Sequence, residues 1–224
     1  MALTRATGIR TGAPITDPSA VWTPPTVGPS DHSHCWMADT LRGTDTSGRV
    51  SRLPDMSGGR DLTTGAPSTN IFRDGDPSAA VSIPAGSGAL TASGGTVRDR
   101  TVLVVAQLVG SKSSQIRTPG WVVGGGAANS LMVNSTNTGR PIPSTMALYV
   151  VTLSTGGTCA VRVNGGDPVT VTSAPGTGTT WALGTNVYSS TVDERYAHVR
   201  AWDRILTADE ITAATAAAKR LHGI

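Results

Sequence analysis

The stretch DHSHC, from Asp31 to Cys35, places two imidazoles beside a carboxylate. Side chains alternate along an extended strand, so His32 and His34 would share one face, and with a carboxylate they could hold a divalent metal ion. No second pair of ligands accompanies them. The alternative is a polar lead into the first strand, and we favour it. The sequence therefore predicts no metal and no cofactor, with His32 and His34 as the positions where a metal would bind.

A second candidate is RDGDP, residues 73–77, in which Asp74 and Asp76 have a spacing that could give oxygens to calcium. The loop has no further obvious ligands, and Asp, Gly and Pro are ordinary residues of tight turns. We favour a plain β-turn. Asp74 and Asp76 are the residues that would bind calcium if the loop does so.

Glycoside hydrolysis uses two carboxylates, about 5 Å apart in retaining enzymes. A strand of the form Glu-x-Asp-x-Glu would supply them, but none occurs. No Gly-x-Ser-x-Gly elbow is present, and His198 is predicted on the outer face of a strand. We therefore predict a protein that is not an enzyme. The acidic residues lie in segments predicted to be turns: Asp45, Asp55, Asp61, Asp74, Asp76, Asp167, Asp193 and Glu194.

Sugar-binding sites usually combine an exposed aromatic ring with polar side chains. Four tryptophans fall within strand-like segments and are predicted to fill the core: Trp36, Trp121, Trp181 and Trp202. Tyr188 lies in a predicted loop, NVYSSTVDERY, together with Asp193. Tyr188 and Asp193 are therefore our predicted ligand-binding residues.

The elements that would position these side chains are predicted to be mainly strands. The chain has 224 residues, and its 27 glycines and 14 prolines suit a turn-rich β-protein better than a helical bundle. Near ten short strands are predicted. The run 101–109 is apolar on both faces, which indicates a central strand. Asn164-Gly165 between two alternating segments predicts a hairpin.

One helix is predicted, at the end of the chain. Thr207 and Glu210 have the spacing of a capping box, and Gly223 is placed to end the helix. Ahead of it, Asp203 and Arg204 are predicted to fix the corner between the last strand and the helix, with Leu206 anchoring that corner in the core. This structural role is favoured over a functional ion pair.

Charge and cysteine content narrow the classes of partner. The 18 basic and 15 acidic residues leave a net charge of +3, and no basic run is interleaved with aromatics, so nucleic-acid binding is not expected. The longest apolar run, residues 102–109, is too short to cross a membrane. Cys35 and Cys159 are expected to be reduced and buried, although a single long-range disulfide is the alternative.

Residues 1–30 contain five prolines and almost no apolar periodicity, and they show no apolar segment typical of a signal peptide. Such a segment is expected to be an extended arm, followed by one domain over residues 31–224.

Several motifs, in order, resemble the concanavalin A-like lectin/glucanase superfamily, the laminin-G-like jelly rolls. They are DTSGRVSRLPDMSGGRDLT, VRVNGGDPVTV, WALGTN and AHVRAWDRILTADEI. Leu53 stands two residues before Asp55, where relatives often have Trp. The resemblance implies an all-β fold: a two-sheet antiparallel jelly-roll sandwich with a short terminal helix lying on it.

Domains of this kind are common in phage virion proteins, so the resemblance also implies a non-enzymatic capsid decoration or minor tail protein. The arm would contact capsid shell or tail subunits, and the domain would be displayed on the particle surface. The alternative is a carbohydrate-binding module that attaches to host surface glycans; a glycoside hydrolase is disfavoured.

Overall fold

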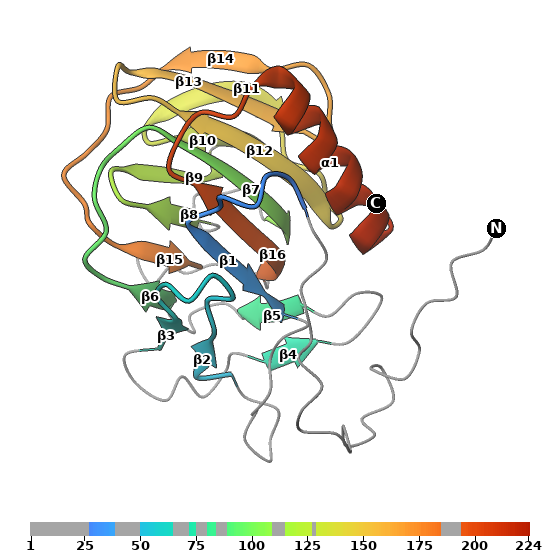
Figure 1. Ribbon diagram of the computed structural model, residues 1–224. Helices are drawn as coiled ribbons and strands as arrows, with labels where there is room; N and C mark the ends of the chain where they lie inside the picture. Colours follow the sequence, from blue (N-terminus) through green and yellow to red (C-terminus); the bar gives the residue numbers. More distant parts are fainter. Residues whose placement is uncertain are drawn as a thin grey trace.

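The computed structural model describes residues 27–38, 50–64, 72–74, 80–83, 89–108, 115–126, 129–184 and 194–224, with the backbone alone for residues 72–74 and 115. Within these residues the chain forms two antiparallel sheets packed face to face and one C-terminal helix (Figure 1). The predicted all-β sandwich with a terminal helix is confirmed.

The first sheet, sheet A, has the strand order β14-β13-β12-β7-β16-β5-β4. β1 also pairs with β16, at residues 198–201, whereas β5 pairs with residues 194–196 of the same strand. The central strand β7 is buried over seven of its eight residues, as the apolar run at 101–109 predicts. The bounds are β1 His34–Met37, β4 Phe72–Asp74, β5 Ala80–Ile83, β7 Arg100–Gln107, β12 Ala147–Leu153, β13 Thr158–Val163, β14 Val169–Thr172 and β16 Glu194–Trp202.

The second sheet, sheet B, has the order β11-β10-β9-β8-β15-β6-β3-β2. At one end, β3 and β6 pair only through Thr63 and Thr91, so the two strands separate beyond that point. The bounds are β2 Arg52–Leu53, β3 Leu62–Thr63, β6 Leu90–Ala92, β8 Gln115–Thr118, β9 Trp121–Gly125, β10 Ser130–Val133, β11 Thr136–Pro141 and β15 Trp181–Leu183.

The interior of the sandwich is filled by the inward-facing residues of both sheets, among them Trp36, Trp121 and Trp181, each at most 2% exposed. Burial of such large rings is a main source of stability in a core of this kind. Trp202 is also buried, but it lies in a second apolar cluster on the outer face of sheet A. The prediction that these four rings are core residues is confirmed.

The second cluster forms because α1, Ala208–His222, lies across the outer face of sheet A (Figure 1). Ile211, Ala214 and Ala218 form its buried stripe, and alanine lets the helix approach the sheet closely. Thr207 and Glu210 form the capping box, and Gly223 ends the helix in the left-handed conformation at φ 68°. This cover explains why β7 is apolar on both faces.

The corner before α1 is held by two separate ion-pair groups. Asp203 pairs with Arg98 and with the buried Arg100, at 3.0 and 2.8 Å. Arg204 pairs with Asp31 and Glu210, at 2.8 and 2.7 Å. Asp203 and Arg204 therefore fix the corner through different partners and not through one another.

Leu206 is 4% exposed, and its side chain lies in the cluster beneath α1, not in the interior of the sandwich. Its backbone N–H donates to Thr101 Oγ1 (2.9 Å), and the same hydroxyl donates to the carbonyl of Arg204 (3.0 Å). The corner is thus tied to β7 by one threonine.

Two further predictions concern the turn at Asn164 and Gly165 and the state of the two cysteines. Asn164 and Gly165 both have positive φ, 52° and 75°, and the N–H of Gly166 donates to the carbonyl of Val163, so the predicted hairpin turn is present. Cys35 and Cys159 are both buried and free, as expected.

The prediction that the acidic residues lie in turns is wrong at two described positions. Asp74 is in β4 and Glu194 is the first residue of β16. Glu194 is 2% exposed and accepts a hydrogen bond from the hydroxyl of Tyr196 (2.7 Å). Its burial beside a hydrogen-bond donor explains how a carboxylate occupies a strand.

Candidate functional site

The predicted ligand-binding residues Tyr188 and Asp193 lie outside the described residues, as does Asp76. The backbone of Asp74 is in β4, and its side chain is not described. The site is therefore built from other side chains.

The side chains of His34 and His32 have separate surroundings. His34 Nδ1 lies 2.6 Å from Asp55 Oδ2, whereas His32 Nδ1 is buried without a hydrogen-bond partner. Within the described part of the chain, no three His, Cys, Asp or Glu side chains are grouped so that they could hold a metal ion.

Asp55 is the centre of the turn between β2 and β3 of sheet B, and it pairs with Trp36 in β1 of sheet A. Its carboxylate accepts the backbone N–H groups of Cys35, Ser57 and Arg60, at 2.9 to 3.0 Å, besides the bond with His34. Burial alone would raise the pKa of Asp55, but the hydrogen bonds from His34 and the backbone outweigh it, and the pKa lies below its ordinary value. Asp55 is therefore a charged structural anchor, fully occupied by its partners.

The imidazole of His34 packs among aromatic rings. It stacks on Trp36 with centroids 4.9 Å apart and meets the edge of Trp181 at 4.8 Å. On Trp181 the guanidinium of Arg100 lies 4.6 Å from the ring centroid. These contacts make a rigid wall behind the turn at residues 55–61.

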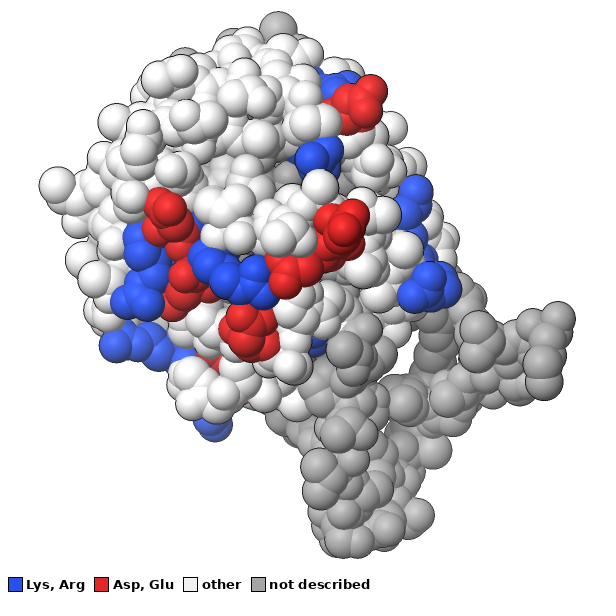
Figure 2. Space-filling view, turned by 45° about the horizontal axis from the view of Figure 1, so that its top comes forward, with Lys and Arg blue, Asp and Glu red and all other residues white. Residues whose placement is uncertain are grey.

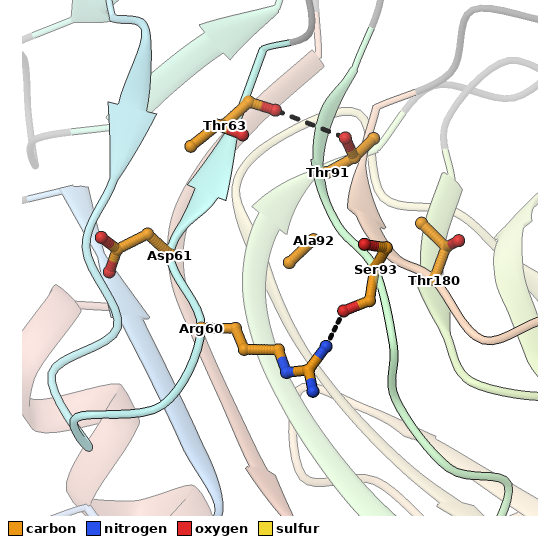
Figure 3. A pocket seen from close by; sticks show the side chains of 7 residues that line it. All are labelled: Arg60, Asp61, Thr63, Thr91, Ala92, Ser93 and Thr180. Atoms are coloured by element: carbon orange, nitrogen blue, oxygen red, sulfur yellow. Dashed lines mark hydrogen bonds between the residues drawn. The ribbon is translucent and has the colours of Figure 1, made fainter.

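Beside this wall, a hollow of about 610 Å³ lies where β3 and β6 separate (Figure 3). We call it the β3–β6 pocket. It is broadly open to solvent, so it is a shallow surface hollow and not an enclosed cavity. Four of its seven lining residues carry hydroxyls, and the others are a guanidinium, a carboxylate and one methyl group: Arg60, Asp61, Thr63, Thr91, Ala92, Ser93 and Thr180.

The two charged residues of the pocket are held differently. Asp61 forms an ion pair with Arg52 and accepts the backbone N–H of Asp55 (2.8 Å), and in Figure 3 its carboxylate points away from Ser93 and Thr180. Arg60 extends from the turn across the gap, and its guanidinium donates to the carbonyl of Ser93. The pocket thus presents hydroxyls and a cation.

Hydroxyls, a guanidinium and backbone carbonyls are the groups that hydrogen-bond a polyol. The described lining offers one carboxylate, whereas glycosidic hydrolysis uses two. Sequence reasoning missed it because its parts come from residues 60–63, 91–93 and 180. Only the sheet pairing brings these three segments together, and no spacing in the sequence indicates it.

A second polar cluster lies buried between β16, β1 and α1. His198 is 1% exposed; it lies on the outer face of its strand, as predicted, but α1 covers it. Its Nδ1 lies 3.2 Å from His222 Nε2, and its Nε2 lies 3.9 Å from Cys35 Sγ. Arg200 donates to Cys35 Sγ and to the carbonyl of Val27. These contacts join the helix, the strand and residue 27.

Surface charge is mixed on the face that Figure 2 shows. Basic and acidic side chains alternate in one band, and most of this face carries neither, so it has no continuous basic surface of the kind that binds nucleic acid. Among the described residues there is also no helix with the length and apolar character needed to cross a membrane.

Comparison with known proteins gives structural matches alone. No protein-family model matches the sequence, and no curated protein matches it. Among solved structures, a Trypanosoma rangeli sialidase in complex with sialic acid matches with a TM-score of 0.58 and 13% identity, over 88% of this chain and 35% of that one.

Two botulinum neurotoxin structures match similarly. The receptor binding domain of type G gives a TM-score of 0.58 at 12% identity, over 84% of this chain and 51% of that one. The serotype D ligand binding domain in complex with N-acetylneuraminic acid gives 0.57 at 9% identity, over 83% and 50%. The chain thus spans a third to a half of the structures it matches. At such identities the likeness shows the fold alone: this chain is a jelly-roll-like, two-sheet antiparallel β-sandwich.

Proposed function

We propose that this chain is a non-enzymatic carbohydrate-binding domain and that the β3–β6 pocket is its binding site. The observation that carries the proposal is the pocket itself, a hydroxyl-rich hollow of about 610 Å³ on a lectin-type sandwich. Sugars present many hydroxyls, and a site that binds them supplies matching donors and acceptors. Thr63, Thr91, Ser93 and Thr180 supply hydroxyls that do both.

The neighbours by fold support a sugar as the ligand class. One is a sialidase in complex with sialic acid, and another is a neurotoxin domain in complex with N-acetylneuraminic acid. Because they share the fold at low identity and carry no residue-level information, the pocket residues come from this chain alone.

The non-enzymatic part of the proposal is supported by the carboxylates of the pocket. Hydrolysis of a glycosidic bond takes two, one as acid and one as nucleophile or base. Asp61 is the one carboxylate in the described lining, and it is engaged by Arg52.

A glycan array tests the proposal. The purified chain is expected to bind a restricted set of glycans, and Thr91→Val or Thr180→Val should weaken that binding about three- to tenfold, since each removes one hydrogen-bonding hydroxyl while keeping the side-chain shape. Thr170→Val is the matched control, because Thr170 is exposed on β14 of the other sheet. Absence of glycan binding, or equal losses in all three variants, would refute the proposed site. Release of reducing sugar from a bound glycan would refute the non-enzymatic role.

We further propose that the domain is displayed on a bacteriophage particle as a capsid decoration or minor tail protein, anchored by residues 1–26. The proline-rich sequence of that segment supports this, as does the way the chain enters the domain. The carbonyl of Val27 accepts a hydrogen bond from Arg200 (2.7 Å), and that of Pro29 accepts one from Trp202 (3.0 Å). Residues 27 and 29, part of the arm expected over residues 1–30, are thus bonded to the domain, and we assign the anchoring role to residues 1–26 alone.

A further inference from the structure

Arg60 is the most firmly positioned polar residue of the β3–β6 pocket. Its backbone N–H donates to Asp55 Oδ2 (3.0 Å), and its carbonyl accepts from Trp36 Nε1 (2.9 Å). Its guanidinium donates to the carbonyl of Ser93. The residue is therefore fixed at both backbone groups and at the end of its side chain.

The chain keeps the space for this guanidinium open. A Cβ atom at Gly94 would lie within contact distance of Arg60 Nη1, and Gly94 has a φ of 82°, which favours glycine. A side chain at position 94 would displace the guanidinium from the gap between β3 and β6. Backbone and side chain thus both place a cation at this point.

The charge of Arg60 is not neutralised within the described residues. The neighbouring carboxylate, Asp61, is bound to Arg52, and Asp55 is bound to His34. No ion pair of Arg60 is found in the described part of the chain, although one of its Nη groups is used by Ser93. A planar guanidinium with remaining donors pairs with a carboxylate or phosphate in two parallel hydrogen bonds.

We propose that the β3–β6 pocket is selective for anionic glycans, with Arg60 binding a carboxylate or a phosphate group of the sugar while the hydroxyls of the pocket bind the ring. The inference rests on the proposed carbohydrate-binding function and adds the ligand class to it. In one case the anionic group is the carboxylate of a uronic or other carboxylated sugar. In the other it is the phosphate of a sugar or polyol phosphate. Both groups offer a pair of oxygens to Arg60.

The experiment measures binding of the full chain to three probes: oligogalacturonate for the carboxylate, poly(glycerol phosphate) for the phosphate and dextran oligosaccharide as the neutral sugar, followed by a glycan array that contains all three classes. One anionic class is expected to bind best. Arg60→Gln should weaken binding of that anionic class about tenfold or more, because the substitution removes a charge-assisted pair of hydrogen bonds. Arg60→Lys should restore part of the lost binding.

Arg162→Gln is the matched control, because it removes the same charge from β13 of the other sheet. Binding should weaken with added salt in the wild type and much less in Arg60→Gln. Thermal unfolding of each variant shows whether the domain is still folded.

Two outcomes would overturn the inference and are distinct from failure of the proposed function. If neutral glycans bind as well as anionic ones, or if Arg60→Gln and Arg162→Gln weaken anionic binding equally, glycan binding stands and the selectivity by Arg60 is wrong. If no glycan of any class binds, the proposed function itself is wrong.

Discussion

At the scale of single residues, the buried charges of this domain differ in how much they depend on their partners. Arg100 is 2% exposed, and its guanidinium is held by Asp203 and by the ring of Trp181. Arg204 is more exposed and is held by Asp31 and Glu210 at the surface. Loss of a partner leaves a buried charge uncompensated in the first case and a hydrated one in the second.

Asp203→Asn should therefore destabilise the domain by about 3 kcal/mol, because it leaves Arg100 buried with one partner fewer. Arg204→Gln should cost much less than Asp203→Asn, since the ion pairs of Arg204 are solvated. Urea unfolding of the two variants measures the difference. Equal losses would contradict the assignment of Asp203 as a partner of the buried arginine.

A second residue-scale feature is the imidazole pair of His198 and His222. Burial lowers the pKa of His222 to about 4, and burial, followed by the charges of His222 and Arg200, lowers the pKa of His198 well below its ordinary value. Arg200, Cys35 and His32 face the pair from β16, β1 and the preceding segment. Among the described side chains that face the pair, an added proton therefore meets the cation of Arg200 and no carboxylate.

The sign of the pH dependence follows from these shifts. Both imidazoles have a lower pKa when folded than when unfolded, so the unfolded state binds more protons below about pH 6.5. These two groups should leave the free energy of unfolding unchanged above that pH. As the pH drops toward 4, His222 should lower it by on the order of 3 kcal/mol, and His198 should lower it further. Urea unfolding at each pH measures it. His222→Leu should reduce the pH dependence of the free energy of unfolding; an unchanged dependence would exclude His222 as a source.

At the scale of elements, α1 and its cap can be predicted from a short stretch of the sequence. Thr207, Glu210 and Gly223 act on neighbouring backbone groups, and so they could be identified without the fold. The same holds for β7, whose continuous apolar run reflects cover on both faces. Strands that pair at edges and carry polar residues, such as β11 with Gly139 and Pro141, gave no such pattern and were missed.

The capping box yields an element-scale prediction. Thr207→Ala should destabilise α1 and cost about 1 kcal/mol, because the backbone N–H of Glu210 loses its acceptor. Thr207→Ser should restore most of the loss, since it keeps the hydroxyl. Urea unfolding monitored by circular dichroism measures the free energy of unfolding of both variants. An equal loss of stability in Thr207→Ser and Thr207→Ala would contradict the cap as the cause.

The candidate site shows why sequence reasoning located the fold better than the function. The β3–β6 pocket depends on the single pairing of Thr63 with Thr91 and on the divergence beyond it. Arg60 looks like an ordinary turn residue in the sequence, and it becomes distinctive when Asp55, Trp36 and Ser93 fix it from three sides. Long-range contacts of this kind leave no local spacing to recognise.

At the scale of the whole molecule, the described residues begin at residue 27 and form a two-sheet sandwich with α1 on the outer face of sheet A (Figure 1). The Cβ that a residue at Gly28 would add lies 2.8 Å from the ring of Trp202 and 3.0 Å from Ala214, so this entry point is closely packed against strand and helix. Removal of residues 27–29 would therefore disrupt this packing.

Deletion of residues 1–26 should leave the unfolding midpoint of the domain unchanged while abolishing incorporation into phage particles, if that segment is the anchor. Deletion of residues 1–30 should lower the unfolding midpoint, because the hydrogen bonds from Arg200 and Trp202 lose their acceptors. Particle incorporation and thermal unfolding are measured on both deletions. Normal incorporation of the shorter deletion would contradict the anchoring role.

The central claim is that the β3–β6 pocket binds a sugar. Nuclear magnetic resonance of the isotope-labelled chain, titrated with the glycan that binds best on the array, tests it most directly. The backbone amides of residues 60–63, 91–93 and 180 should shift, and those of β14 on the other sheet should not. Shifts confined to other parts of the chain would place the site elsewhere and contradict the claim.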